Sequence, residues 1–394
     1  MSTTLAKSEK NNVIGATLLV TGCCIGAGMI GLPIACLQTG FIPSAITMLL
    51  SYLFTTITGL LLLEATLWFD QKVNLLSVVD FTLGKKGKVL VGILFLLLFY
   101  SIFVAYIDGG GELFTSLVSK VFGLSIPKSI GNSIFVVFIG LISYLGTQSV
   151  DKINKILMIG LLLTYCTLVT VGAPHIKLDN LFYIKWSACF KTLPILFICF
   201  GFQNLVPSLT YYLKKNTQEL RFSIITGNFL ALILYLIWDF IILGMVPHDT
   251  SFKSDMVVGL INKVSNFSAT LFAIQAFTFF ALVSSFLAIA ISFVDFFKDS
   301  FSTTITKKSQ KFLIHCFVFL PPLFFSFFNP HVFLKSLEFA GGFVDVILFG
   351  ILPILIIWNG RYIKKVQSTY TVSGGKFFLC LLLILSIAIL FIQI

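Results

Sequence analysis

Long apolar stretches alternate with short polar segments along this chain, and each stretch is long enough to cross a lipid bilayer as a helix. About 20 consecutive apolar residues span the roughly 30 Å hydrocarbon core. The stretches lack the period-two alternation of barrel strands, so the pattern predicts helices, which pair every backbone polar group internally. Eleven spans are expected, at residues 13–38, 41–69, 89–118, 130–149, 153–173, 189–212, 222–244, 268–296, 312–328, 333–357 and 377–393.

Composition agrees with this pattern. Hydrophobic residues make up 57% of the 394 residues and charged residues 11%, with a mean hydropathy of +1.01. Such values lie outside the usage of soluble globular proteins. We therefore expect an all-α integral membrane protein surrounded by a lipid bilayer. The first span continues well beyond the roughly 7 to 15 apolar residues of a signal peptide, so it is expected to remain in the membrane.

The distribution of charge predicts the orientation. The net charge of +11 would suggest a nucleic-acid partner on a soluble protein. With the N-terminus in the cytoplasm, however, 19 of the 27 Lys and Arg residues lie in cytoplasmic segments and 8 on the opposite side. This arrangement follows the positive-inside rule and puts the C-terminus outside. No basic tail remains for nucleic acid, which is therefore not expected as a partner.

Cysteine and histidine give no sign of a metal site. The eight cysteines fall within or at the edges of predicted spans, and the four histidines lie in loops or at helix ends without ligand spacing. Such cysteines are most simply small apolar packing residues, and metal ligands need a recognisable spacing. We expect neither a metal nor a cofactor.

The first functional feature is a glycine-rich interruption of the first span, TGCCIGAGMIGLP at residues 21–33. Glycines followed by a proline favour local unwinding of a helix. The segment contains G-x-G-x-x-G, but no strand precedes it, so a dinucleotide site is excluded. Gly22 and Gly26 could alternatively be a pair of small residues that lets two helices pack closely.

The second feature, CFGFQNLVPSL at residues 199–209, places amides and a proline at membrane depth in the sixth span. Two broken spans at corresponding places in two halves are the sequence sign of a transporter with inverted repeats. Each half has five spans, which is an odd number. The second half therefore enters the membrane from the opposite side, as an inverted repeat requires. We expect a cytoplasmic segment at 1–12, repeats at 13–173 and 189–357, and an extra helix at 377–393.

Several segments together resemble a known family. They are IGAGMIGLP at 25–33, LLLEA at 61–65, AYIDGGGEL at 105–113, FGFQNLVPSL at 200–209 and SSFLAIAISFVDF at 284–296. The chain resembles the bacterial hydroxy and aromatic amino acid permeases, within the amino acid, polyamine and organocation transporters. The resemblance implies a leucine-transporter-like fold with five plus five helices and one extra helix. It also implies import of aromatic amino acids, most of all tyrosine, across the bacterial inner membrane.

A substrate site follows from the two interruptions. The half-helix that begins in the first interruption favours the substrate carboxylate at its N-terminus, and freed carbonyls can accept from the ammonium group. Aromatic side chains would stack against the substrate ring, and amides would meet a phenol hydroxyl or an indole N–H. The predicted substrate-binding residues are Gly26, Ala27, Gly28, Tyr106, Phe200, Gly201, Phe202, Gln203 and Asn204.

Acidic residues at membrane depth are candidates for ion coupling, because they are costly there. Asp108 and Glu112 are four residues apart on one helix face, and Asp345 lies in the middle of its span. Glu64, Asp239 and Asp295 lie nearer the ends of their spans, where snorkelling or a helix-end interaction is expected. Proton coupling is implied by the resemblance. Sodium is the alternative, through Ala281, Ser284 and Ser285, which match the spacing of the cation site in sodium-coupled relatives.

Other function classes are weaker. A channel needs a continuous polar stripe or rings of charge, and a primary pump needs a nucleotide motif that is absent. A membrane enzyme needs a catalytic constellation that the histidines do not supply. A sodium-coupled carrier, or a carrier of another neutral amino acid with the same fold, remains the main alternative, with a membrane enzyme or channel as the alternative outside that class.

Overall fold

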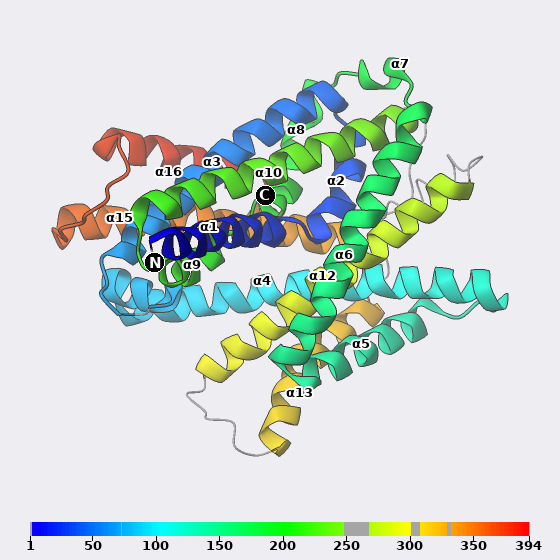
Figure 1. Cartoon of the computed structure of the whole chain (residues 1–394), viewed down its shortest axis with the longest axis horizontal. Coiled ribbons are helices and arrows are strands. Elements are labelled where there is room, and N and C mark those ends of the chain that lie inside the picture. Colours follow the sequence, from blue (N-terminus) through cyan, green and yellow to red (C-terminus); the bar gives the residue numbers. More distant parts are fainter. Residues whose placement is uncertain (1, 72, 248–267, 301–307, 329–331, 394) are drawn as a thin grey trace.

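The computed structural model describes the chain except for residues 1, 72, 248–267, 301–307, 329–331 and 394, and every regular element in the described part is helical (Figure 1). The helices that begin and end the spans, with the short elements that matter below, are α1 (Ser2–Cys24), α2 (Ala27–Leu37), α3 (Phe41–Leu67), α4 (Leu75–Phe122), α5 (Lys128–Leu145), α6 (Thr147–Gly172), α7 (Leu178–Leu181), α8 (Cys189–Cys199), η3 (Gln203–Leu205), α9 (Val206–Tyr212), α10 (Thr217–Met245), α12 (Ser268–Ser300), α13 (Lys308–Phe328), α14 (Phe333–Glu338), η4 (Phe339–Ile351), α15 (Leu352–Trp358), η5 (Asn359–Ile363) and α16 (Gly375–Gln393).

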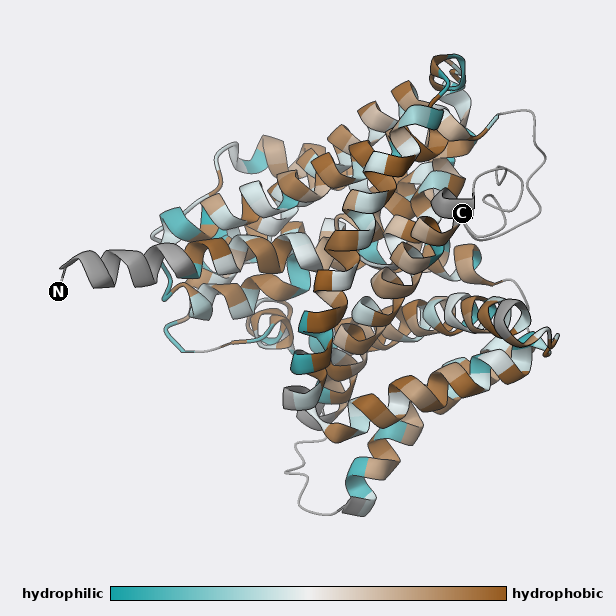
Figure 2. Ribbon diagram, turned by 45° about the vertical axis from the view of Figure 1, so that its right-hand side comes forward, coloured by the Kyte–Doolittle hydropathy of each residue, from teal (hydrophilic) through white to brown (hydrophobic). Residues whose placement is uncertain are grey.

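Ten helical segments among the described residues are long and apolar enough to cross a membrane, and the bent pair of α1 and α2 makes an eleventh. One span is built from α8, η3 and α9, and another runs from α14 through the π-helix η4 to η5. The all-helical, eleven-span fold predicted from hydropathy is thereby confirmed. Hydrophobic residues predominate along the helices (Figure 2), and many large apolar side chains are exposed, as a lipid-facing surface requires.

The third span differs from its prediction at its start. The helix α4 begins at Leu75 rather than at residue 89, and the side chain of Asn74 caps it by accepting from the N–H of Ser77. At Gly84 the backbone has φ of 75°, so the chain turns there between two helical segments. Hydropathy alone missed the first segment because three lysines between 85 and 88 interrupt the apolar run.

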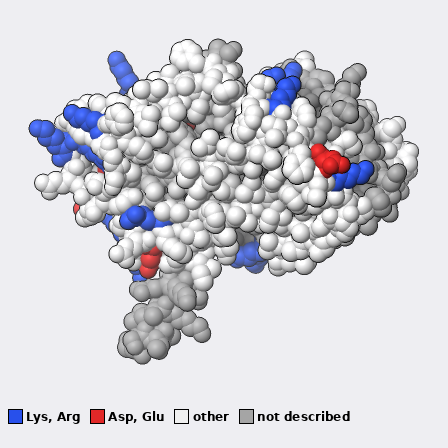
Figure 3. Space-filling model, turned by 90° about the horizontal axis from the view of Figure 1, so that it is seen from above, with Lys and Arg blue, Asp and Glu red and all other residues white. Residues whose placement is uncertain are grey.

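The molecular surface is mostly uncharged. Seen from above, Lys and Arg side chains stand in isolated groups, most of them toward the end where the chain begins (Figure 3). The same end carries the start of α10 and the end of α15 (Figure 1). Over the middle of this face charged side chains are few, as a lipid-facing surface requires (Figure 3).

The glycine tract of α4 serves close packing against α5. A Cβ atom added to Gly110 would lie 2.0 Å from a ring carbon of Phe135, and one added to Gly111 would lie 1.7 Å from the Asn132 side-chain oxygen. Only glycine allows this approach of two membrane helices. The tract beside Asp108 therefore has a structural role.

A buried ion pair ties two distant spans together. Arg361 in η5 donates to both carboxylate oxygens of Glu64 in α3, at 2.6 and 2.5 Å, and Glu64 is fully buried. Arg361 also donates to the carbonyl of Val372, whose own N–H donates to Glu64. Glu64 is thus held by a cation from another span, an ion pair that the sequence alone did not predict, and it does not snorkel. Asp239 in α10 does not snorkel either: it is 0% exposed, because it lies on the face of α10 that packs inside the bundle.

Candidate functional site

The first span bends where its glycines predict a break. The helices α1 and α2 meet at 53°, and only Ile25 and Gly26 separate them. Gly26 adopts φ −155° and ψ −144°, and no side chain caps the first turn of α2. The first N–H groups of such a helix lack intrahelical partners, so this end has the positive end of the helix dipole available for an anion.

Side chains of α10 hold the bend in place. The Tyr235 hydroxyl donates to the carbonyl of Cys24 at 2.6 Å, and its oxygen lies 3.4 Å from the carbonyl of Cys199 at the end of α8. On the far side of the bend, the Trp238 indole N–H donates to the carbonyl of Met29 at 2.8 Å. These bonds satisfy buried carbonyls and join both interrupted spans to one continuous helix.

The sixth span is also interrupted where predicted. The helix α8 ends at Cys199, and a short 3-10 turn, η3, leads into α9. Cys23 faces this interruption, with its sulfur 3.7 Å from the Gly201 carbonyl and 3.8 Å from the Asn204 side-chain oxygen. A Cβ atom on Gly28 would lie 2.5 Å from the Cys199 sulfur. The two breaks therefore lie against each other, and their closeness requires glycine at position 28.

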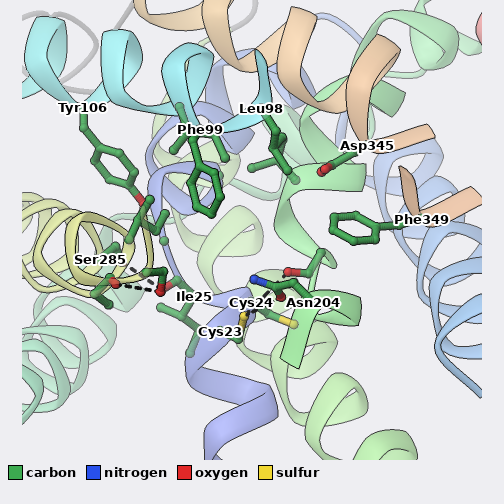
Figure 4. Close-up of a pocket in the computed structure, with 18 of the residues that line it drawn as sticks. Cys23, Cys24, Ile25, Leu98, Phe99, Tyr106, Asn204, Ser285, Asp345 and Phe349 are labelled. Carbon is green, nitrogen blue, oxygen red and sulfur yellow. Dashed lines mark hydrogen bonds between the residues drawn. The ribbon is translucent and has the colours of Figure 1, made fainter. Parts of the chain in front are cut away.

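A cavity of about 170 Å³ opens between the two breaks (Figure 4). Its size suits a molecule smaller than the drug-sized ligands that fill roughly 300–1,000 Å³. The wall is mainly apolar, with a few polar groups. The lining residues are Gly22, Cys23, Cys24, Ile25, Gly26, Gly28, Phe95, Leu98, Phe99, Ile102, Tyr106, Ile198, Gly201, Asn204, Ser285, Ala288, Ile289, Ser292, Asp345 and Phe349.

The aromatic side of the cavity is held by ring stacking from behind. Tyr106 stacks on Phe286 at 5.2 Å between centroids and 7° between planes, and Phe99 stacks on Phe293 at 4.6 Å and 14°. Both partners belong to α12. Rings fixed in this way can meet a ligand with little loss of side-chain entropy.

Several predicted site residues lie outside the lining. Phe200 packs edge-on against Tyr235, and Phe202 packs against α3, where a Cβ on Gly59 would lie 2.6 Å from its ring. The Gln203 amide nitrogen lies 3.3 Å from the Thr58 hydroxyl, and the residue is buried. Tyr106, Gly26, Gly28, Gly201 and Asn204 do line the cavity, whereas the side chain of Ala27, the first residue of α2, lies outside what the structure describes.

Sequence reasoning missed three lining residues that helical periodicity could have found. Phe99 and Ile102 lie seven and four residues before Tyr106 in α4, on the same face of the helix. Phe349 lies four residues after Asp345 in η4. Cys23 was interpreted as a packing residue, and the structure places it in the cavity wall.

Two of the coupling candidates share a cation away from the cavity. The Lys128 ammonium nitrogen lies 2.9 Å from a carboxylate oxygen of Asp108 and 3.4 Å from one of Glu112. Lys128 begins α5, so this contact joins it to α4. Neither acid is among the residues that line the cavity. Their charges are compensated in part by the one lysine.

The two serine candidates of α12 donate hydrogen bonds to different parts of the structure. Ser285 donates to the carbonyl of Ile25 at 3.1 Å, directly at the first break, whereas Ser284 donates to the carbonyl of Ala281 in its own helix at 3.2 Å. Only the first bond joins α12 to the break. Among the described residues, no cluster of three His, Cys, Asp or Glu side chains could hold a metal ion.

Asp345 is the acidic residue of the cavity wall. It is 4% exposed, it lies in the π-helix η4, and its Oδ1 atom has no hydrogen-bond partner. Its Oδ2 atom lies 3.4 Å from the position a Cβ would take on Gly201. Figure 4 places its carboxylate on the same side of the cavity as Phe349. π-Helices are rare and are frequently found at functional sites.

The arrangement of two broken spans around a small cavity is that of a carrier. Comparison of the sequence with known families gives a match to the tryptophan/tyrosine permease family over residues 9–393. The chain belongs to this family. It is therefore a permease, a multi-pass membrane transporter rather than an enzyme.

Individual relatives of the permease match it nearly end to end. It is 29% identical to the tyrosine-specific transport system 1 of Haemophilus influenzae, with 96% of each chain covered. It is 28% identical to glutamine transporter 2 of Aliivibrio fischeri, with 97% of the permease and 99% of that chain covered. Similar overall identity thus accompanies relatives named for an aromatic and for an amide substrate.

Among solved structures, the permease is similar to MhsT crystallised with L-phenylalanine. The TM-score is 0.65, the sequence identity 17%, and the match covers 96% of the permease and 97% of that chain. At this identity the likeness concerns the fold alone. It supports the leucine-transporter-like architecture that the positions of the two breaks predict.

Proposed function

We propose that this permease imports an aromatic amino acid, tyrosine in the first place, across the bacterial inner membrane by proton symport. The observation that carries the proposal is the small cavity at which both broken spans and an aromatic wall meet. Its orientation would follow the positive-inside rule, with the N-terminus in the cytoplasm and the C-terminus outside. The names of the family and of the tyrosine-specific relative support the substrate class.

The two ends of a zwitterion match the two kinds of backbone groups at the breaks. The uncapped first turn of α2, near Gly26 and Gly28, offers N–H donors and the positive end of a helix dipole to the carboxylate. The carbonyl of Gly201, in the second break, would accept from the ammonium group beside the Cys23 sulfur, which lies 3.7 Å away. No Lys or Arg occurs among the lining residues, so the carboxylate would be held by the backbone.

The aromatic ring would lie between Phe99, Tyr106 and Phe349, which line the cavity. Offset or edge-on contacts with such rings contribute about 0.5–1.5 kcal/mol beyond burial. Phe200, Phe202 and Gln203 would act indirectly, because they fix the second break against α3 and α10. Asn204 is the lining amide that could meet a phenol hydroxyl.

The second candidate is a sodium-coupled carrier, and it too rests on a contact. The Ser285 hydroxyl and the Ile25 carbonyl, 3.1 Å apart, are two oxygens of the kind that would bind a sodium ion between α12 and the first break. The glutamine transporter among the relatives leaves a smaller neutral amino acid as the alternative substrate.

Uptake of radiolabelled tyrosine into proteoliposomes tests the proposal, with a proton gradient and a sodium gradient imposed separately. Tryptophan, phenylalanine, leucine and glutamine serve as competitors. Proton-driven uptake that aromatics compete for is the expected result. Uptake driven only by sodium would overturn the coupling, and competition by glutamine but not by tryptophan would overturn the substrate class.

Replacement of a cavity ring sharpens the test. Phe349→Ala should weaken competition by tyrosine more than competition by leucine, because the ring contact is lost. Phe138→Ala is the matched control, since Phe138 is 48% exposed on the surface of α5. Equal effects of the two variants would show that Phe349 makes no ring contact with the substrate.

A further inference from the structure

The cavity wall contains one carboxylate, and nothing in the wall neutralises it. Asp345 is 4% exposed, and its Oδ1 atom accepts no hydrogen bond. No Lys, Arg or His is among the residues that line the cavity. A buried carboxylate without a cation or hydrogen-bond donors is strongly disfavoured in its ionised form.

Glu64 and Asp108, two other buried acids, differ in this respect. Glu64 is bound on both oxygens by Arg361. Asp108 has the ammonium of Lys128 at 2.9 Å. Asp239 is as buried as Asp345 and its Oδ1 atom likewise has no hydrogen-bond partner, but it belongs to α10 and is not among the lining residues. Among the described acids, Asp345 is thus the one that combines burial, an unpaired oxygen and a place in the cavity.

The ionisable groups around Asp345 leave it without a compensating charge. Cys23 and Cys24 of α1 and Tyr106 of α4 share the cavity wall, and the lining residues from α8 and α12 are not ionisable. The other elements packed against η4 hold their ionisable groups in other contacts or at the surface. In α3 these groups are Glu64, paired with Arg361, and Tyr52, whose ring meets Phe229. In α8 they are Lys191, which is exposed, and Cys199, whose sulfur lies beside Gly28. In α14 and α16 they are the exposed Lys335, Glu338 and Cys380, and Lys376 over the Tyr362 ring.

The position of Asp345 connects it to both breaks. A Cβ on Gly341, one turn earlier in η4, would lie 1.8 Å from the carbonyl oxygen of Pro194, so η4 lies directly against α8. The carboxylate itself lies beside Gly201, which in turn accepts a hydrogen bond from Cys23 of the first break. A change of charge on Asp345 would act at the two segments whose rearrangement opens a carrier of this fold.

We propose that Asp345 is the residue that carries the coupled proton. When the cavity faces outside, a proton from water forms an O–H bond with the carboxylate. When the cavity faces inside, that bond breaks and the proton passes to water. Only the protonated, neutral form of Asp345 is compatible with a cavity that is closed to water. Proton binding is therefore coupled to closure of the cavity. This inference rests on the proposed proton symport.

Asp345→Asn tests the inference, because asparagine has the shape of the protonated acid and cannot release the proton. In proteoliposomes, this variant should lose accumulation of tyrosine above equilibrium under a proton gradient. It should keep exchange of external labelled tyrosine for internal unlabelled tyrosine, since exchange needs no return of the empty carrier. Asp239→Asn is the comparison for an equally buried acid outside the cavity, and it should accumulate tyrosine as the unchanged protein does.

Each other outcome has a definite meaning. Proton-driven accumulation by Asp345→Asn, or its loss in Asp239→Asn alone, would overturn the inference. Loss of both exchange and accumulation in a folded Asp345→Asn protein would also overturn the inference, and would assign Asp345 to the binding of the substrate's ammonium group. Absence of proton-driven uptake in the unchanged protein would instead refute the proposed function.

A measurement on the unchanged protein guards against a variant that does not fold. Dicyclohexylcarbodiimide adds to protonated carboxyl groups in apolar surroundings, and peptide mass spectrometry locates the adduct. Asp345 should be modified, and raising the pH should slow its modification. Modification of Asp239 with Asp345 untouched would contradict the inference.

Discussion

Tyr235 offers the sharpest test of how the first break is held. Its hydroxyl donates to the carbonyl of Cys24, the last residue of α1, at 2.6 Å. That carbonyl has lost its place in a regular helix because the chain bends at the next two residues. Tyr235→Phe removes the donor and leaves the ring, which packs against Phe200, in place.

The expected magnitude follows from the number of bonds lost. The hydroxyl has one proton, and its second contact, with Cys199, is long at 3.4 Å, so the variant loses one hydrogen bond. A buried carbonyl left without its donor costs about 1–3 kcal/mol. If this cost falls on the bent form that binds substrate, affinity decreases roughly 5- to 150-fold.

The assay is equilibrium binding of radiolabelled tyrosine to the purified protein, with the unfolding temperature measured alongside. Tyr165→Phe is the matched control. Like Tyr235, Tyr165 donates from its hydroxyl to a backbone carbonyl, that of Leu234 in α10, at 3.0 Å. This carbonyl, however, lies within a continuous helix. We expect the control to change affinity less than twofold, since the intact helix itself satisfies that carbonyl.

Two results would refute the reasoning. One is unchanged affinity in a folded Tyr235→Phe protein, which would mean that the bend needs no donor. The other is an equal loss of affinity in both variants, which would attribute the effect to the aromatic hydroxyls of the bundle in general.

Three further predictions follow from contacts elsewhere. Gly341→Ala should prevent correct packing of η4, at a cost of at least about 1–3 kcal/mol, because its Cβ would lie 1.8 Å from a carbonyl oxygen of α8. Gly140→Ala, with nothing within 4 Å, should not lower the unfolding temperature. Glu64→Gln should lower the stability by about 3–5 kcal/mol, since it leaves the half-buried Arg361 without its carboxylate, and denaturant-free thermal unfolding in detergent measures this. Cys23, as the single cysteine of an otherwise Cys→Ser protein, should react with a small maleimide more slowly when tyrosine is bound; unchanged labelling at saturating tyrosine would remove the substrate from this cavity.

The positions of the breaks could be predicted from sequence because their cause is local. Glycines at 26 and 28 and a proline at 33 lower the helix propensity of one short segment, and the bend occurs at Ile25 and Gly26. The eleven spans could be predicted for a similar reason, since apolar length is a property of the segment alone.

The direction in which individual side chains point could not be predicted in the same way. After a break, η3 continues as a 3-10 turn, so helical spacing no longer tells which side chain points into the cavity. The change turns Phe202 and Gln203 toward α3 while Asn204 reaches the cavity. Contacts between helices are equally hidden, and the pairing of Asp108 with Lys128 depends on how α4 and α5 align.

The single acid of the cavity wall has an electrical consequence. A zwitterion has no net charge. With Asp345 protonated, the loaded site would therefore be neutral while it changes from facing outside to facing inside. Empty and deprotonated, it would return with one negative charge. The voltage-dependent step would then be the return of the empty carrier, and each cycle would move one positive charge inward. One charge is worth about 2.3 kcal/mol per 100 mV, or roughly 50-fold accumulation of substrate, so the membrane potential alone could drive uptake.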